Sequence, residues 1–199
     1  MKSTIHSQVW LIRHAQSTGN AGLPSDSPGS IPLTDTGHTQ AKTLAESIET
    51  SPDLIVVSPY LRTQQTAAPL ITLHPEVQVE EWPVHEFTYL NTQTHAGTTE
   101  AQRRVFAQTY WERCDPDWRD GTDAESFVEF IRRIDALELS LRKRRGLRIM
   151  IFTHGYFIKG FILRRQHPAA DVDHAFMAAF RDNRRNNLPR NTEVVELET

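Results

Sequence analysis

The chain has 199 residues, 38% of them hydrophobic and 24% charged, which is the composition of one globular domain with a sizeable core. Its formal net charge of −3 argues against general nucleic-acid binding, because such binding needs a concentrated basic surface. The single cysteine, Cys114, excludes a disulfide framework and a cysteine metal cluster.

The first half of the chain alternates predicted strands and helices. Residues 1–8 contain no long apolar stretch, so we expect neither a signal peptide nor a transmembrane helix, and a cytoplasmic protein without membrane association. Thr34 is a suitable N-cap for the first helix, and a loop rich in Gly, Pro and Ser precedes it. In chain order we expect a buried strand over 9–12, a mobile loop over 22–32, a helix over 35–47, a buried strand over 54–57, a helix over 61–73 and a strand over 77–79.

The second half continues this alternation after a different middle segment. Residues 86–120 are rich in aromatic side chains and show no strand period. The predicted elements are helices over 98–113 and 126–145, a strand over 148–153, a helix over 155–165 and a last strand over 191–198. Strands that alternate with helices predict an α/β sandwich with a mostly parallel sheet.

Two histidines follow predicted strands directly. Arg13 and His14 end the first strand and enter a polar loop that contains Asn20, and His154 follows Thr153 at the end of a later strand. In parallel α/β sheets, ligands bind beyond the carboxyl ends of the strands. A guanidinium beside an imidazole suits phosphoryl transfer, because the arginine binds the dianion that a neutral histidine attacks.

Four further segments complete a recognisable pattern: residues 33–41, 58–67, 124–126 with Arg133, and 152–155. Together with the Arg13-His14 loop, they resemble the histidine phosphatase superfamily, the phosphoglycerate mutase-like enzymes, in the branch with an Arg-His-Gly motif. Ala15 replaces the usual glycine of that motif. The resemblance covers nearly the whole chain and implies a three-layer α/β/α sandwich. It also implies one domain over 1–199, in which 86–120 form a small helical cap that sets the choice of substrate.

The chemistry of these residues fits a phosphate dianion. Arg13 and Arg62 offer two planar forks for phosphate oxygens, and His154 adds a third positive or donating group. We therefore expect no cofactor and no metal; the nine histidines include no pair at a zinc-like spacing. The predicted catalytic residues are His14, Glu86, His154, Arg13 and Arg62. The candidate substrate contacts are Asn20, Ser17, Gln16, Phe87 and Tyr89.

Glu86 is the predicted general acid. By the resemblance, a carboxylate after the third strand protonates the leaving alkoxide, and residues 84–86 stand where the family has Leu-x-Glu. The apolar neighbours of Glu86 favour its protonated form. Glu80 and Glu81 remain alternatives, although their place at the end of a strand suits a solvated role better.

We interpret the chain as a phosphomonoester hydrolase that forms a phosphohistidine on His14 and binds a small phosphorylated metabolite or inorganic phosphate. A phosphoprotein or phosphohistidine phosphatase is an alternative, and the large aromatic segment argues against it. A mutase-type phosphotransferase is disfavoured, because a long basic insert is missing. A non-catalytic phosphate-binding module is disfavoured by the retention of all five catalytic residues. A homodimer remains open, because the sequence does not determine the oligomeric state.

Overall fold

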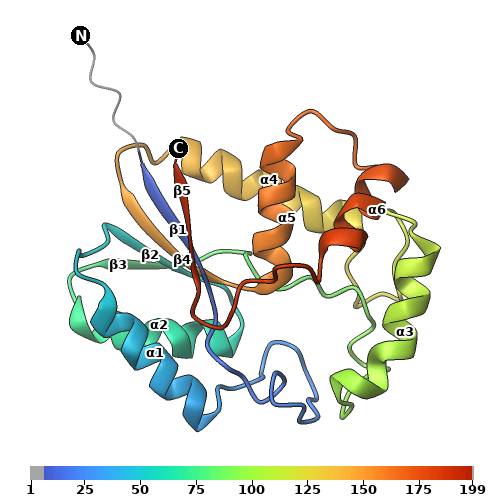
Figure 1. Ribbon diagram of the computed structural model, residues 1–199, viewed down its shortest axis with the longest axis horizontal. Coiled ribbons are helices and arrows are strands. Elements are labelled where there is room, and N and C mark those ends of the chain that lie inside the picture. Colours follow the sequence, from blue (N-terminus) through green and yellow to red (C-terminus); the bar gives the residue numbers. More distant parts are fainter. Residues whose placement is uncertain (1–6, 199) are drawn as a thin grey trace.

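The computed structural model describes residues 7–198, which form one sheet between two layers of helices (Figure 1). The strands are β1 (Gln8–Arg13), β2 (Leu54–Val57), β3 (Gln78–Glu81), β4 (Arg148–Thr153) and β5 (Val194–Glu198). The helices are α1 (Asp35–Ser47), α2 (Leu61–Leu73), α3 (Glu100–Arg113), α4 (Phe127–Arg142), α5 (Gly155–Gln166) and α6 (His174–Asn183).

The sheet has the order β3-β2-β4-β1-β5, with four parallel strands and an antiparallel β5 at one edge. This confirms the predicted α/β fold with a mostly parallel sheet. The pairing of β1 with β4 aligns Arg13 with Thr153. Likewise, the pairing of β2 with β4 aligns Val57 with Phe152. The carboxyl ends of these three neighbouring strands therefore meet at one edge of the sheet.

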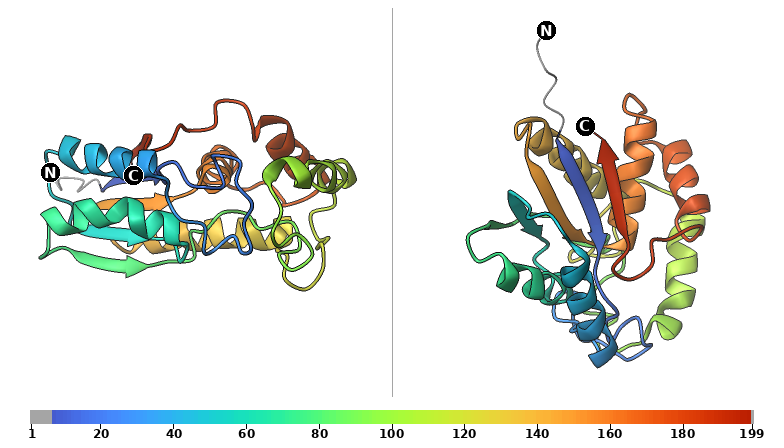
Figure 2. Two further views of the ribbon diagram at one scale, coloured as in Figure 1. Left: turned by 90° about the horizontal axis from the view of Figure 1, so that it is seen from below. Right: turned by 60° about the vertical axis from the view of Figure 1, so that its left-hand side comes forward.

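The central strands β1, β2 and β4 are largely buried on both faces, which explains their nearly continuous apolar sequences, whereas the edge strand β3 is mostly exposed. Helices α1 and α2 cover one face, and α4 and α5 cover the other (Figure 2). Alternate residues of one strand divide between the two layers, as the period of a strand requires. Under α1 and α2, the strands contribute Ile12, Ile55, Val57, Met150 and Phe152. Under α4 and α5, they contribute Val9, Leu11, Leu54, Val56, Ile149 and Ile151.

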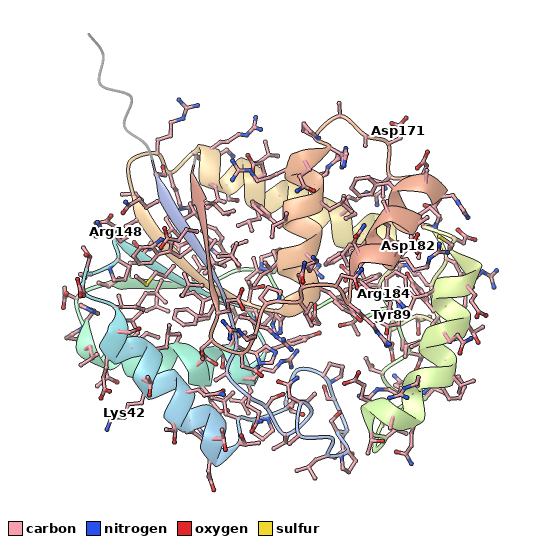
Figure 3. The ribbon with its side chains drawn as sticks, viewed as in Figure 1. Lys42, Tyr89, Arg148, Asp171, Asp182 and Arg184 are labelled. Atoms are coloured by element: carbon pink, nitrogen blue, oxygen red, sulfur yellow. The ribbon has the colours of Figure 1, made fainter. Side chains whose placement is uncertain are left out.

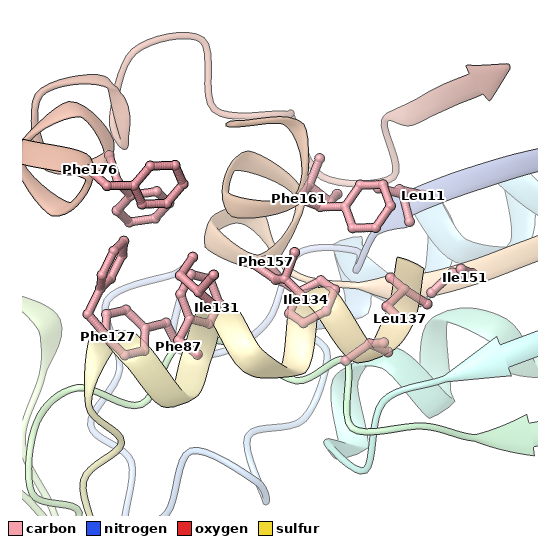
Figure 4. Packing of buried hydrophobic residues seen from close by; sticks show 14 of the residues in the cluster. Leu11, Phe87, Phe127, Ile131, Ile134, Leu137, Ile151, Phe157, Phe161 and Phe176 are labelled. Carbon is pink, nitrogen blue, oxygen red and sulfur yellow. The ribbon is translucent and has the colours of Figure 1, made fainter. Parts of the chain in front are cut away.

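The second core layer continues beyond the sheet into an aromatic cluster. Phe87 stacks on Phe130 of α4 with ring centroids 4.5 Å apart, and Trp111 of α3 lies 5.8 Å from Phe180 of α6. Figure 4 shows Phe87, Phe127 and Phe176 at the end of the row of apolar side chains along α4. The predicted aromatic segment 86–120 thus packs against α4 and α6.

Hydrogen-bonding side chains cap the starts of α1, α3 and α4. The Thr34 hydroxyl accepts from the amide of Gly37, as predicted for the first N-cap. Thr99 and Ser126 form capping boxes with Gln102 and Glu129. These boxes explain why α3 and α4 begin at Glu100 and Phe127, one or two residues later than the sequence predicts.

Other elements depart further from the sequence prediction: α4 ends at Arg142 rather than at 145, and β5 begins at Val194 rather than at 191. Helix α6 was not expected, and Asp173 caps it by accepting from the amide of Phe176. Strand β3 runs to Glu81, so that Glu80 and Glu81 lie within the strand. In the described range 7–198, no helix combines the length and apolar character needed to cross a membrane.

Helices α4 and α5 approach closely at Gly160, and we expect Gly160→Ala to destabilise the protein. A Cβ at this position would lie 2.6 Å from Cδ1 of Ile134 and 2.9 Å from the Phe130 ring. Overpacking of this kind costs about 1–3 kcal/mol, more than the roughly 1 kcal/mol that alanine adds in helix propensity. Chemical denaturation measures the free energy of unfolding.

The matched control is Gly29→Ala, where the nearest atom to the new Cβ is an ordinary 3.7 Å away. The control should change the free energy of unfolding by less than about 0.5 kcal/mol. Equal stability of the two variants would contradict the tight contact between α4 and α5.

Candidate active site

The ends of β1, β4 and β2 deliver three polar side chains to one point. His14 follows β1 and His154 follows β4, and the centroids of their rings lie 5.1 Å apart. Ser58 follows β2, and its hydroxyl lies 2.8 Å from Nε2 of His154. All three side chains are buried. The predicted neighbourhood of His14 and His154 is thus present in the fold.

The His14 ring is oriented by the backbone carbonyl of the next residue, Ala15. Nδ1 lies 2.7 Å from the carbonyl oxygen of Ala15. Because a carbonyl only accepts, Nδ1 carries the proton and Nε2 keeps its lone pair. Burial, reinforced by the charge of Arg62, lowers the pKa of His14 well below its usual value. His14 is therefore a neutral imidazole with an unprotonated Nε2.

His154 has both ring nitrogens engaged by protein groups. Its Nδ1 accepts from Nη2 of Arg62 at 3.0 Å, because a guanidinium only donates. Nε2 then carries the proton and donates to Ser58. Burial and the charge of Arg62 lower the pKa of His154 well below its usual value. The sequence predicted a positive or donating group here; in the structure, Nδ1 of His154 accepts from Arg62 and Nε2 contacts Ser58.

Arg62, near the start of α2, is buried and positioned from three sides. Besides His154, it donates from Nη1 to the Pro28 carbonyl at 2.7 Å, and its guanidinium lies 4.9 Å from the centroid of the Tyr60 ring. Burial lowers the pKa of Arg62 to about 10, so that the group is still charged at neutral pH. Within residues 7–198, Arg62 forms no ion pair with a carboxylate, and a desolvated cation of this kind is well suited to bind an anion.

Arg13 lies beside this group at the end of β1. Its Nη1 donates to the Pro189 carbonyl at 2.6 Å, so part of the guanidinium is already hydrogen-bonded within the protein. Its buried Nε has no hydrogen-bond partner within residues 7–198. Burial lowers the pKa of Arg13, and the carboxylate of Glu86 is the main opposing influence. Arg13 therefore retains a donor for an anionic ligand.

The Glu86 carboxyl lies at the N-terminus of α5. It accepts from the amides of Tyr156, at 3.1 and 3.2 Å, and Phe157, at 3.2 Å, and from its neighbour Phe87 at 3.1 Å. Burial raises the pKa of Glu86, and the Tyr156 amide and the charge of Arg62 oppose that rise. These opposing influences suit a carboxyl group that both gives and takes a proton.

A cavity of about 200 Å³ adjoins Arg62 and Glu86. One wall is the loop of residues 25–31, and the other is formed by residues 86–103. The two walls are joined where the Ser25 amide donates to the Thr98 carbonyl and the Gly97 amide donates to the Ser25 carbonyl. Side chains of the second wall that line the cavity include Tyr89, Asn91, His95, Glu100 and Arg103.

The two aromatic residues that the sequence placed in the pocket differ in burial. Phe87 is 3% exposed and belongs mainly to the aromatic core, although it lines the inner end of the cavity. Tyr89 is half-buried and lines the cavity wall. Figure 3 shows Tyr89 near Arg184, between α3 and the chain that follows α6.

The three polar residues predicted after His14 organise their loop. The Asn20 side-chain oxygen accepts from the amide and the hydroxyl of Ser17 at 3.2 and 3.1 Å. The side-chain nitrogen Nδ2 of Asn20, which is a donor, is the group that could bind a ligand oxygen. The Gln16 side-chain oxygen accepts from the Thr34 hydroxyl at 2.8 Å, which fastens the loop to α1. Ser17 is 2% exposed and belongs to the interior of the loop.

The alternative acids have other partners. Glu80 accepts from Nε1 of Trp82 at 2.7 Å and pairs with Arg144 at 3.2 Å. Glu81 accepts from Gln64 at 3.2 Å. Neither carboxyl group is among those that line the cavity beside Arg62. Of these three glutamates, Glu86 is the one that lines the cavity, and the charges of Arg62 and Arg13 act on it.

Sequence reasoning missed several residues that build the site. Ser58 and Tyr60 contact His154, and Asn191 donates from Nδ2 to the His14 carbonyl at 2.8 Å. The Ser-Pro pair before α2 was a usable signal for Ser58. Nothing local marks Asn191, because its contact spans nearly the whole chain. In the described part of the chain, no three His, Cys, Asp or Glu side chains gather in a way that would hold a metal ion.

Comparison with known proteins agrees with this geometry. Residues 9–181 match the model of the histidine phosphatase superfamily, branch 1. A putative α-ribazole-5′-P phosphatase from Escherichia coli is similar in structure, with 25% identity, a TM-score of 0.65 and coverage of 79% of this chain and 78% of that chain. No curated protein matches in the sequence comparison.

Two further solved structures share the fold over nearly the full length. A mycobacterial glucosyl-3-phosphoglycerate phosphatase has 22% identity and a TM-score of 0.72, with 97% of this chain and 90% of that chain covered. A phosphoserine phosphatase from Entamoeba histolytica has 21% identity and a TM-score of 0.68, with 96% and 89% covered. The chain therefore belongs to the histidine phosphatase superfamily, branch 1, as a phosphatase.

Proposed function

We propose that the protein is a metal-independent phosphomonoester hydrolase that forms a phosphohistidine on His14 and acts on a small phosphorylated metabolite. This proposal rests mainly on the protonation and the orientation of His14. His14 is a buried, neutral imidazole whose Nδ1 is held by the Ala15 carbonyl and whose Nε2 retains its lone pair. A histidine nucleophile needs this combination of fixed orientation and unprotonated nitrogen.

In the first step, Nε2 of His14 attacks phosphorus, an N–P bond forms and the ester P–O bond breaks. The Glu86 carboxyl gives its proton to the departing oxygen, so the alcohol leaves neutral and Glu86 becomes a carboxylate. Arg13 and Arg62 bind the oxygens of the transferring phosphoryl group. Their charges supply the neutralisation for which many other phosphoryl-transfer enzymes use Mg²⁺.

In the second step, water attacks the phosphohistidine. The Glu86 carboxylate takes a proton from the water, the N–P bond breaks, and inorganic phosphate leaves. His14 is again neutral, and Glu86 again holds its proton. His154 contributes by holding Arg62 in place through its Nδ1.

The size of the cavity favours a small leaving group. Its volume of about 200 Å³ lies below the roughly 300–1,000 Å³ of sites for drug-sized ligands. Residues 86–120 serve as a cap on a single domain, since Tyr89 and Arg103 from this segment line the cavity. Phosphoserine and glucosyl-3-phosphoglycerate, named for the similar phosphatases, are substrates of the proposed class. A phosphoprotein would need a more open site.

We expect His14→Ala to abolish turnover while the protein still binds phosphate, because Arg13 and Arg62 remain. Phosphate release from a panel of phosphomonoesters with EDTA present measures turnover, and calorimetry with orthovanadate or phosphate measures binding. The control is His38→Ala, which removes an exposed histidine of α1 and should leave both unchanged. Turnover by His14→Ala at the normal rate would overturn the assignment of the nucleophile.

Glu86→Gln should slow esters with poor leaving groups far more than activated aryl esters. A neutral amide cannot protonate the departing alkoxide, a contribution of about 100-fold or more. The measurement compares kcat/KM for phenyl phosphate and p-nitrophenyl phosphate, because kcat/KM reports the first step and not the hydrolysis of the phosphohistidine that both esters share. Glu81→Gln is the matched control, since Glu81 is bonded to Gln64 and is not among the residues that line the cavity. An equal loss on both esters would move the acid role to another residue.

The pH profile of kcat/KM for phenyl phosphate should be bell-shaped. His14 reacts as the neutral base, and its lowered pKa places the acid limb below pH 6.5. Glu86 reacts as the acid, and its raised pKa places the alkaline limb above pH 4.5. Glu86→Gln should remove the alkaline limb and keep the acid limb. An unchanged alkaline limb in this variant would show that another group donates the proton.

A further inference from the structure

Arg133 of α4 forms a close ion pair beside the segment that carries Glu86. Its Nε and Nη2 donate to the two oxygens of Glu125 at 2.6 and 2.8 Å. The side chains are only 14% and 15% exposed, so water competes weakly for the pair. The guanidinium also lies 5.5 Å and 5.4 Å from the ring centroids of Phe130 and Phe157. Arg133 is therefore held in one orientation.

The remaining nitrogen of Arg133 holds the backbone next to Glu86. Nη1 donates to the carbonyl of Pro83 at 2.7 Å and to the carbonyl of His85 at 3.0 Å. On the other side of Glu86, the amide of Glu125 donates to the Thr88 carbonyl at 2.8 Å. Arg133 and Glu125 thus hold the chain both before and after Glu86.

The segment needs such support, because it has no regular structure of its own. Strand β3 ends at Glu81, and the next helix begins at Glu100. Backbone carbonyls outside helices and strands must find other donors when they are shielded from water. Thr153 supplies one of them by donating from Oγ1 to the Val84 carbonyl at 2.5 Å. Arg133 supplies two more, immediately before Glu86.

We propose that Arg133, oriented by Glu125, is a positioning residue for the proton-transfer step. It fixes the backbone of residues 83–86 so that the Glu86 carboxyl stays at the amides of α5, within reach of the leaving oxygen. This role rests on the proposed function of Glu86 as the general acid. A shift of about 1 Å in a reacting group can cost on the order of 100-fold in rate.

Arg133→Lys is the substitution that tests this positioning role. It keeps the positive charge beside Glu125, but one ammonium group cannot reproduce the planar fork that serves Glu125 and two carbonyls together. A matched pair exists away from the site: Arg164 of α5 donates to Asp135 at 2.8 and 3.3 Å and to the Ala170 carbonyl at 2.6 Å. Arg164→Lys therefore removes the same kind of contacts without touching the segment of Glu86.

The experiment measures kcat and KM for substituted phenyl phosphates that differ in the pKa of the phenol. These esters share the phenyl phosphate core and differ in the need of the leaving group for a proton. We expect Arg133→Lys to steepen the dependence of kcat/KM on leaving-group pKa, with about a tenfold or larger loss for phenyl phosphate and a smaller loss for p-nitrophenyl phosphate. KM and orthovanadate affinity should change little, because Arg13 and Arg62 are untouched. Glu125→Gln should act in the same direction.

The possible results distinguish a failure of the positioning role of Arg133 from a failure of Glu86 as the general acid. If Glu86→Gln steepens the leaving-group dependence and Arg133→Lys does not, Glu86 is the acid and the positioning role is wrong. If neither variant changes the slope, the general-acid assignment itself fails. A purely structural role predicts that Arg133→Lys and Arg164→Lys lower the melting temperature alike and leave the slope unchanged. Circular dichroism and thermal unfolding of each variant show whether it is folded at the assay temperature.

Discussion

The parallel pairing of β1 with β4 is the constraint on which the site depends. Its register aligns Arg13 with Thr153, and the next residue on each strand is a histidine. Because neighbouring strands lie about 4.8 Å apart, the two imidazoles must come together where the strands end. A slip of one residue in this register would reverse the direction of every side chain on one strand. The hydrophobic pattern of the two strands therefore positions the proposed nucleophile as firmly as it forms the core.

The electrostatic properties of the site follow from the burial of Arg13 and Arg62, neither of which forms an ion pair with a carboxylate within residues 7–198. Arg62 stays charged at a pKa of about 10, and its charge helps to keep His14 and His154 neutral. Positive charge is thereby concentrated on guanidinium groups, whose planar forks match phosphate oxygens. In the proposed mechanism, one neutral imidazole attacks phosphorus and the other orients Arg62. One source of charge would thus serve both the proposed binding of an anion and the proposed reactivity of His14.

Much of this arrangement could be predicted from sequence, because local patterns encode it. Continuous apolar runs predicted the parallel strands, and the position directly after two of these strands predicted that Arg13, His14 and His154 belong to the site. Helix α6 was missed although Phe176, Met177 and Phe180 lie at helical spacing and Asp173 is a suitable N-cap, so a local signal was present. Another feature was beyond local reasoning. The contact between Glu86 and the amides of α5 joins residues 70 positions apart in the sequence. Periodicity and composition describe short segments and cannot predict a contact between segments so far apart.

The hydrogen bond between Arg62 and the Pro28 carbonyl has a consequence for protein engineering. Pro28 belongs to the same loop as Ser25, whose backbone exchanges hydrogen bonds with residues 97 and 98 of the opposite wall. The arginine and both walls of the cavity therefore form one connected unit. Grafting residues 86–120 from another phosphatase, without the matching loop at 25–31, would disturb the support of the arginine as well as the pocket. Redesign of specificity must exchange the two walls together, or else alter single cavity side chains such as Tyr89 and leave the backbone in place.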